Sequence, residues 1–241
     1  GFLAALLAGF VAGYLVLGIK KLADKLPESM EGIKPVLIYP LFGVLLIGVF
    51  MFAVNPTMAA INTGITSFLN SMGGSSKILL GCIVAGMMSI DMGGPFNKAA
   101  YVFGTASIAS GNYDVMAAVM IGGMIPPLAV ALATTFFKKK FTSEERKSGV
   151  VNYIMGLCFI TEGVIPFAAA DPLRVIPSCV AGSAVAGGLS MLFGCTLRAP
   201  HGGIFVFPVV GNVVGYLIAL AAGSLVGMLL LGVLKKDKVA E

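Results

Sequence analysis

The chain has 241 residues, of which 58% are hydrophobic and only 11% are charged, against roughly a quarter charged in an ordinary soluble domain. With a mean hydropathy of +0.98, it has too few charges to cover a surface that faces water. The same numbers exclude intrinsic disorder, which needs low hydrophobicity and a high net charge. The composition therefore predicts an all-α integral membrane protein.

The net charge of +5 is carried largely by three basic clusters, each of which borders a long apolar run. This distribution follows the positive-inside rule, so we expect all three clusters on the cytoplasmic side. It argues against nucleic-acid binding, because the sequence has no basic face interleaved with aromatic residues. The clusters are Lys20, Lys21, Lys25 and Lys34; then Lys138, Lys139, Lys140, Arg146 and Lys147; then Lys235, Lys236 and Lys238.

The usual catalytic and metal-binding motifs are absent from the sequence. It contains no GxxxxGK[ST] phosphate loop, no HExxH and no convincing Ser-His-Asp set, so any energy must come from a gradient or a partner. The cysteines lack CxxC spacing and lie in or beside apolar segments, as is typical of small buried hydrophobes. We expect no metal and no cofactor. The cysteines are Cys82, Cys158, Cys179 and Cys195.

A helix needs about 20 apolar residues to cross the hydrocarbon core of a bilayer. Five windows reach that length, and several shorter apolar stretches are interrupted by Gly, Pro or an ionisable residue. Short, broken segments indicate re-entrant hairpins or discontinuous helices around a transport site. The long windows are 1–19, 35–54, 114–137, 173–195 and 211–233; the short stretches are 78–90, 99–110, 150–160, 163–170 and 203–209.

The three basic clusters give a consistent topology if all of them are cytoplasmic. Window 114–137 must then run inward, so segment 55–113 begins and ends outside and contains either a hairpin or two short crossings. The last two windows return the chain to the cytoplasm, which leaves 150–170 as a hairpin entered from the cytoplasmic side. We expect one membrane domain over 1–241. Its expected cytoplasmic loops are 20–34 and 138–148.

Several polar segments have a plain structural interpretation. Residues 62–70 suggest an amphipathic interfacial segment followed by a turn at Gly73 to Ser76. The charged run KKKFTSEERK suggests a solvated loop, with docking of an acidic partner as the alternative. Lys77 and Asp114 fit a membrane interface. Because Asp171 precedes Pro172, it fits a helix N-cap that pairs with Arg174. Since the chain opens inside an apolar run, we also expect helices upstream of Gly1.

The first motif with functional potential is Ile160-Thr161-Glu162-Gly163, followed by Ile165-Pro166-Phe167. Glu162 is the only charged residue in an otherwise apolar stretch, and a carboxylate at membrane depth is too costly to face lipid. At the tip of a broken helix it could be held by free backbone groups and accept hydrogen bonds from sugar hydroxyls. A purely structural Glu162 is the alternative.

The second motif runs from Ser89 to Lys98, where Gly-Gly-Pro breaks a helix beside Asp91, Asn97 and Lys98. Asp91 and Lys98 either serve a ligand or form a structural ion pair. This motif resembles the first one, since Ile90-x-x-Gly93 and Ile160-x-x-Gly163 both lead to Pro-Phe. If the two enter the membrane from opposite faces, they are candidates for an inverted repeat.

The third motif is Arg198-Ala199-Pro200-His201-Gly202-Gly203, which holds the only histidine of the chain. A lone histidine is often merely packed or solvated. Here it lies between two spanning windows in irregular backbone, which is tolerated at membrane depth only inside protein or beside a water-filled cavity. A neutral imidazole offers one donor and one acceptor, which suits a hydroxyl group.

At these three motifs the sequence resembles the membrane-embedded IIC component of the bacterial phosphoenolpyruvate-dependent sugar phosphotransferase system, fructose-specific family. The resemblance extends over essentially the whole chain and corresponds to the C-terminal part of the family's domain. It is carried by MSIDMGGPFNKAAYVFGTA (88–106), FITEGVIPFAAADPLRVIPS (159–178) and FGCTLRAPHGGIFVFPVVGN (193–212).

The resemblance implies that a sugar crosses the inner membrane while a cytoplasmic IIB domain, phosphorylated on cysteine, transfers phosphate to it. The usual product in the fructose family is fructose 1-phosphate. A sugar-binding role carries over to Glu162, and less directly to His201 and Asp91, because related families place their important histidine elsewhere. The resemblance also implies a homodimer in the lipid bilayer and an elevator-like motion of the sugar-binding part. It places the phosphorylated cysteine outside this chain.

Together, the residues and the resemblance predict a hexose site among tips 89–98 and 159–167 and loop 198–203. Glu162 and His201 are the predicted catalytic residues, which orient the hydroxyl that attacks phosphorus. One rival is a proton-coupled secondary sugar transporter with Asp91 or Glu162 as proton carrier; another is a non-transporting membrane scaffold. The predicted substrate-binding residues are Thr161, Glu162, Gly163, Asp91, Asn97, Lys98, Arg198, His201 and Gly202.

Overall fold

The computed structural model describes residues 2–71 and 74–238, apart from some side chains near the N-terminus and around residues 61–75. Within these residues nearly all regular structure is helical, as predicted, and the chain divides into two compact units, 1–68 and 69–241. The helices are α1 (Phe2–Ala23), α2 (Tyr39–Ser71), α3 (Gly74–Met87), α4 (Pro95–Ala109), α5 (Asp114–Phe136), α6 (Ser143–Leu157), α7 (Ile165–Ala170), α8 (Pro172–Leu192) and α9 (Val213–Leu234). Shorter elements are 3₁₀ turns at Glu28–Met30, Lys138–Lys140, Glu162–Val164 and Gly203–Val209, a π-helical turn at Lys34–Ile38, and the strand pair β1 (Thr196–Leu197) and β2 (Val210–Gly211).

Four described helical segments are long and apolar enough to cross a membrane: 34–60, 114–136, 172–192 and 213–234. They coincide with four of the five predicted windows. The fifth window, 1–19, falls on α1, where several side chains lie outside the described residues, so its crossing stays a prediction. The short predicted stretches correspond to α3, α4, α6, α7 and the 3₁₀ segment at Gly203.

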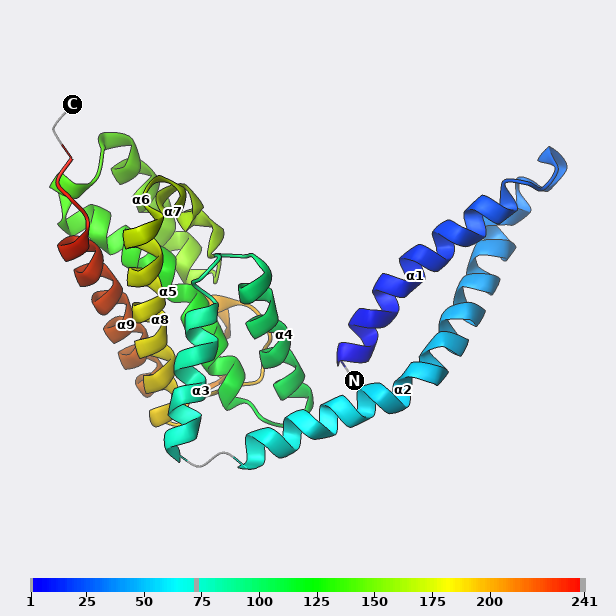
Figure 1. Ribbon diagram of the computed structural model, residues 1–241, viewed down its shortest axis with the longest axis horizontal. Coiled ribbons are helices and arrows are strands. Elements are labelled where there is room, and N and C mark those ends of the chain that lie inside the picture. Colours follow the sequence, from blue (N-terminus) through cyan, green and yellow to red (C-terminus); the bar gives the residue numbers. More distant parts are fainter. Residues whose placement is uncertain (1, 72–73, 239–241) are drawn as a thin grey trace. The chain divides into compact units, whose positions relative to one another are not determined.

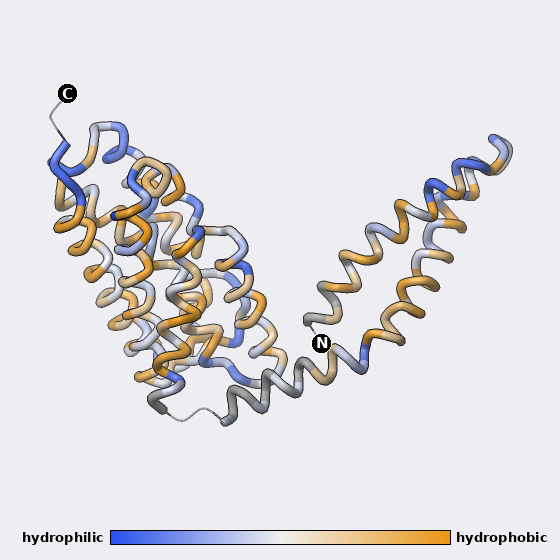
Figure 2. The backbone as a smooth tube through the Cα atoms, in the orientation of Figure 1, coloured by the Kyte–Doolittle hydropathy of each residue, from blue (hydrophilic) through white to orange (hydrophobic). Residues whose placement is uncertain are grey.

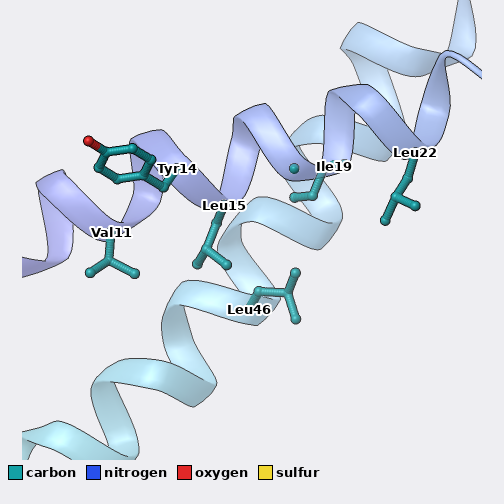
Figure 3. Close-up of a pocket in the computed structure, with 7 residues that line it drawn as sticks. Val11, Tyr14, Leu15, Ile19, Leu22 and Leu46 are labelled. Carbon is teal, nitrogen blue, oxygen red and sulfur yellow. The ribbon is translucent and has the colours of Figure 1, made fainter.

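The first unit consists of α1 and α2 joined by a polar turn. Figure 2 shows this turn as a hydrophilic segment between two largely hydrophobic helices. Within the turn, Lys34 is buried and its Nζ lies 2.7 Å from Glu31 Oε2. Near the turn, α1 and α2 leave a groove between them (Figure 3), which is lined by Gly18 and by the side chains of Val11, Tyr14, Leu15, Ile19, Leu22 and Leu46.

The second unit is built around α5, which is buried along almost its whole length. Helices α3, α4, α6, α8 and α9 all contact it, and α8 and α9 pack against each other (Figure 1). The packing uses glycines, as is usual for membrane helices. A Cβ at Gly122 would lie 2.5 Å from the Ala85 Cα, and one at Gly182 would lie 2.7 Å from the Gly223 carbonyl oxygen.

Two hairpins enter this unit from opposite ends of α5. The α3–α4 hairpin starts where Lys77 Nζ lies 3.0 Å from Asp114 Oδ2, at the first residue of α5. The α6–α7 hairpin follows the last turn of α5, and each hairpin leads directly into a spanning helix, α5 or α8. The opposite entry of the two hairpins is therefore as predicted, whereas the inverted repeat itself stays a prediction.

Some predicted boundaries were wrong. Residues 62–70 continue α2 without a break, and Gly74 to Ser76 form the first turn of α3, while Gly73 lies outside the described residues. The expected loop 138–148 ends early, because a capping box between Thr142 and Glu145 starts α6 at Ser143. The expected loop 20–34 is shortened by α1, which continues to Ala23.

The two later basic clusters meet at one end of the second unit, which we call the basic end (residues 138–147 and 235–238). Lys140 Nζ lies 3.2 Å from Asp237 Oδ1, and Lys238 Nζ lies 2.9 Å from Glu145 Oε1. Burial works to raise the pKa of Glu145, but hydrogen bonds from Lys238 and the Thr142 backbone outweigh it and lower that pKa. The Glu145–Lys238 pair therefore contributes its full stabilisation at pH values above the ordinary pKa of glutamate. This contribution is lost as the pH falls through the lowered pKa of Glu145.

The basic end also holds Lys235, a buried lysine with one carboxylate partner among the described residues. Its Nζ lies 3.4 Å from Asp171 Oδ2 and 5.0 Å from the Phe141 ring centroid. Asp171 occupies the N-cap position of α8, as predicted, although its side chain makes no cap hydrogen bond. The predicted pair with Arg174 is confirmed, at 3.0 Å. Asp171 therefore neutralises two cations at the junction of α7 and α8.

We expect Asp171→Asn to lower the melting temperature of the detergent-solubilised protein strongly. It leaves the Lys235 ammonium buried without a counter-charge, a change that typically costs about 3–5 kcal/mol. Lys235→Met should cost much less, because Asp171 keeps Arg174 and the site becomes apolar. Adding Lys235→Met to Asp171→Asn should restore part of the lost stability. Equal melting temperatures for the two single variants would contradict this assignment.

Candidate functional site

The first hairpin tip is the turn 88–94 between α3 and α4. Asp91 organises it, since Oδ2 accepts from Phe96 N at 2.6 Å and Oδ1 accepts from Asn97 N at 2.9 Å, two free amides of the first turn of α4. Asn97 is buried and donates from Nδ2 to the Met88 carbonyl at 2.8 Å. Among the described residues no Asp91–Lys98 ion pair forms; Lys98 Nζ instead donates to the Gly93 carbonyl.

The second tip follows α6 and holds the Thr161-Glu162-Gly163 motif. Thr161 is buried, whereas Glu162 is exposed at the start of the 3₁₀ turn Glu162–Val164. A Cβ at Gly163 would collide with the Asn152 side chain of α6, so this tip lies tightly against its own hairpin. The predicted support of the carboxylate by backbone amides is not found among the described residues.

The two tips meet at Gly93. A Cβ added there would lie 2.7 Å from Oε1 and 3.2 Å from Cδ of Glu162, and the Gly93 φ of +108° also favours glycine. Lys98 binds the carbonyl of the same Gly93. Gly93 is therefore contacted by two charged groups. The Glu162 carboxylate of the second tip lies against its Cα, and the Lys98 ammonium donates to its carbonyl oxygen.

The third segment reaches the second tip from the loop between α8 and α9. Gly203 packs so closely on the backbone of Leu157 and Cys158 that a Cβ would not fit, and its φ is +54°. This contact brings the exposed His201 to the Phe159 ring, with 5.2 Å between ring centroids and an interplanar angle of 67°. Tyr101 of α4 lies 6.5 Å from the His201 ring.

Most of the predicted site residues thus lie on segments that contact one another. Asp91, Asn97 and Lys98 frame the first tip; the second tip holds Thr161, Glu162 and Gly163; and His201 and Gly202 lie on the third segment. Arg198 lies elsewhere, with its guanidinium carbon 4.9 Å from the centroid of the Tyr113 ring, next to the first residue of α5. A role for Arg198 in sugar binding stays a prediction, and wild-type sugar affinity in Arg198→Gln would assign it to packing on Tyr113.

Two aromatic residues of this region were missed as site residues. Tyr101 and Phe159 lie 6.3 Å apart between ring centroids, and both contact His201. Tyr101 follows Asn97 by four residues, so the two share a face of α4. This spacing could have identified Tyr101 as a site residue from the sequence. Phe159 precedes the Thr161 motif, but its contacts with Tyr101 and His201 depend on the tertiary fold.

Comparison with known proteins identifies the family. The family model described as "Phosphotransferase system, EIIC" matches residues 1–182, three quarters of the chain. The chain belongs to the phosphotransferase system EIIC family. EIIC proteins are membrane components, in agreement with the spanning helices described above. The family match includes both hairpin tips and ends before the His201 segment.

The relatives of this EIIC chain extend the similarity beyond residue 182. It is 54% identical over 237 residues to the "PTS system fructose-specific EIIABC component" of Bacillus subtilis, covering 98% of the chain and 37% of that relative. It is 53% identical to the "Fructose permease IIC component" of Bacillus amyloliquefaciens, covering 98% and 78%. It is 48% identical to the "PTS system fructose-specific EIIB'BC component" of Escherichia coli, covering 89% and 39%. No solved structure is a significant match.

The site offers polar groups suited to a neutral, hydroxyl-rich ligand. The Glu162 carboxylate accepts hydrogen bonds, the Lys98 ammonium donates them, and the His201 imidazole can do both when neutral. All three side chains are exposed on the second unit. Among the described residues, no group of three or more His, Cys, Asp or Glu side chains could hold a metal ion.

Proposed function

We propose that this EIIC chain binds fructose and carries it across the cell membrane while a IIB domain phosphorylates it. The observation that carries the proposal is the meeting of the two hairpin tips at Gly93, with Glu162, Lys98 and, through Phe159, His201 in the same region. The names of the relatives, which are fructose-specific components or a fructose permease, support the choice of sugar.

In this proposal the sugar hydroxyls bind to Glu162, Lys98 and His201. Thr161, Gly163 and Gly202 shape the backbone around them, while Asp91 and Asn97 keep the first tip in place through their hydrogen bonds to backbone groups. Hydroxyl groups pair well with such charged partners, because charge-assisted hydrogen bonds are the stronger ones. Arg198 is a weaker candidate for direct binding, since its guanidinium packs on Tyr113.

Phosphoryl transfer would use the same site from the cytoplasmic side. We propose that Glu162 and His201 orient the attacking hydroxyl, because phosphoryl transfer depends mainly on positioning and on charge stabilisation. The phosphoryl group comes from a phosphocysteine on the IIB domain: the sulfur–phosphorus bond breaks as the oxygen–phosphorus bond forms, and the proton that the hydroxyl loses balances the cysteine thiolate that leaves. The charged product then binds less well in a site built for a neutral sugar, which makes uptake one-way.

The basic end is the proposed docking place of the IIB domain. The names of several relatives join B and C components in one protein, which supports a IIB partner. At this end Lys140, Lys235 and Lys238 are paired with carboxylates, while Lys138, Lys139 and Arg146 are exposed. From the resemblance to the family, we also propose a homodimer and an elevator-like motion of the sugar-binding part.

We expect cysteines introduced at Ser143 and Asp237 to react with an impermeant thiol reagent only from the cytoplasmic side. Both positions are exposed at the basic end, which the positive-inside rule places in the cytoplasm. The native cysteines are replaced first, because Cys82 and Cys158 are partly exposed. Labelling of either position in intact cells by reagent added outside would contradict the topology.

The two rival functions lose support. Every relative named above is a phosphotransferase component or a fructose permease, so the comparisons do not favour a proton-coupled transporter. A scaffold without transport would leave the contact between Glu162 and Gly93 without a purpose. Equilibrium binding of radiolabelled fructose to the purified protein, competed by other hexoses, tests the proposed ligand. Saturable binding that fructose displaces best supports the proposal, and no saturable binding contradicts it.

A further inference from the structure

Phe159 occupies an unusual backbone position just before the second tip. Its φ is +63°, in the left-handed region that a bulky side chain rarely adopts. The residue is nevertheless 7% exposed, so its ring lies in the interior of the second unit. Backbone strain of this kind persists only where the surrounding structure holds it, and it is common at functional sites.

The Phe159 ring lies where α5 leaves room for it. Gly123, in the middle of α5, is so close that a Cβ there would collide with the edge of the ring at Cε2. The same Cβ would lie 3.1 Å from Met88 Cε of the first tip. The Phe159 ring and Met88 of the first tip therefore both pack against α5 at Gly123.

The Phe159 ring also packs against the two other aromatic groups of the site. His201 packs edge-on at 5.2 Å between centroids, and Tyr101 lies at 6.3 Å. Phe159 thus contacts the spanning helix, the first hairpin and the third segment, and it is three residues from Glu162. Among the described residues no hydrogen bond holds the His201 side chain, so ring packing is what locates its imidazole.

We propose that Phe159 is a positioning residue that fixes the position of the His201 imidazole relative to Glu162. Its own ring is held by packing against Gly123. It acts through His201 and does not itself need to touch the sugar. The left-handed backbone turns the ring toward α5 while the next residues turn Glu162 toward Gly93. As far as it concerns sugar affinity, this inference rests on the proposed function.

Two substitutions should disturb the imidazole in different ways, one by removing the Phe159 ring and the other by displacing it. Phe159→Leu removes the ring but keeps an apolar side chain, and Gly123→Ala displaces the ring from its place against α5. Each should weaken fructose binding about three- to tenfold, the equivalent of one aromatic pair. In Gly123→Ala/Phe159→Leu the smaller side chain makes room for the new methyl group, so the double variant should bind no worse than the worse single variant.

Phe167→Leu is the matched control. Phe167 is also buried and lies on the same hairpin, and its ring packs edge-on against Phe141, with 6.3 Å between ring centroids, rather than against His201. Its replacement should lower the melting temperature about as much as Phe159→Leu does. It should leave fructose affinity unchanged, because it removes core packing without touching the imidazole.

The decisive readout is the NMR signal of the imidazole of His201, the single histidine of these 241 residues, identified as the signal that is lost in His201→Ala. In the intact protein in detergent, Phe159→Leu and Gly123→Ala should shift this signal, since a neighbouring ring is lost or moved, while Phe167→Leu should not. Combining Phe159→Leu with His201→Ala should weaken binding no further than His201→Ala alone.

An unshifted imidazole signal in both Phe159→Leu and Gly123→Ala, or additive losses of affinity with His201→Ala, would overturn the inference. The proposed function fails separately, if the wild-type protein and the Phe167→Leu control bind no fructose. In that case the imidazole signal still decides whether Phe159 positions His201.

Discussion

Replacing Glu162 with Gln is expected to weaken fructose binding by about tenfold to a hundredfold. The substitution keeps the size of the side chain but removes its charge, so sugar hydroxyls lose a charged acceptor. A lost hydrogen-bond partner costs about 1–3 kcal/mol, and more when a charge is involved. About 1.4 kcal/mol corresponds to a factor of ten in affinity. Equilibrium binding in detergent measures the effect.

Glu162→Ala should bind still more weakly, since it removes the whole acceptor. Because Glu162 is exposed, neither variant should lose much stability. Glu144→Gln provides the control, as it removes an exposed carboxylate at the basic end and should leave affinity unchanged. Normal sugar binding by Glu162→Gln, with a defect confined to uptake driven by a proton gradient, would instead favour the proton-coupled rival.

Gly93→Ala is expected to cause the second large loss of sugar affinity, about tenfold. The new methyl group would lie 2.7 Å from Oε1 of Glu162, so the carboxylate must move away from the first tip. Misplacing one binding group by about an ångström is enough for an effect of this size. The measurement is again fructose binding, together with the melting temperature.

Gly111→Ala separates this collision from backbone strain. Gly111 also has a left-handed φ, +82°, but a Cβ there meets no atom within 4 Å. It should lower stability by about 1 kcal/mol and leave sugar affinity at the wild-type level. If Gly111→Ala and Gly93→Ala weaken binding equally, the contact between Gly93 and Glu162 has no part in the site.

Hydrophobic length was enough to predict the spanning helices and the hairpins, because a bilayer constrains both. The stretches around Ser89 and Glu162 were too short to cross, and Gly and Pro marked the points where their helices break. The end of the loop after Lys140 was missed, although Thr142 and Glu145 have the spacing of a capping box. The density of charge there was interpreted as a solvated loop.

The residues of the candidate site could be predicted in part. Glu162 was conspicuous as a lone carboxylate in an apolar stretch, and His201 as a lone histidine in irregular backbone. The contacts of Phe159 with Gly123, Tyr101 and His201 could not be predicted, because they join distant segments and depend on a left-handed backbone. One alternative for Asp91, an ion pair with Lys98, was wrong. The Asp91 oxygens instead accept hydrogen bonds from two backbone amides.

The most direct test is sugar uptake by membrane vesicles that contain this chain within its complete EIIC component, with and without a phosphorylated IIB domain. We expect labelled fructose to accumulate only with phosphorylated IIB, to be recovered inside as a sugar phosphate, and to accumulate equally in the presence of an uncoupler. Accumulation of free fructose that needs no IIB domain and collapses with the uncoupler would contradict the account.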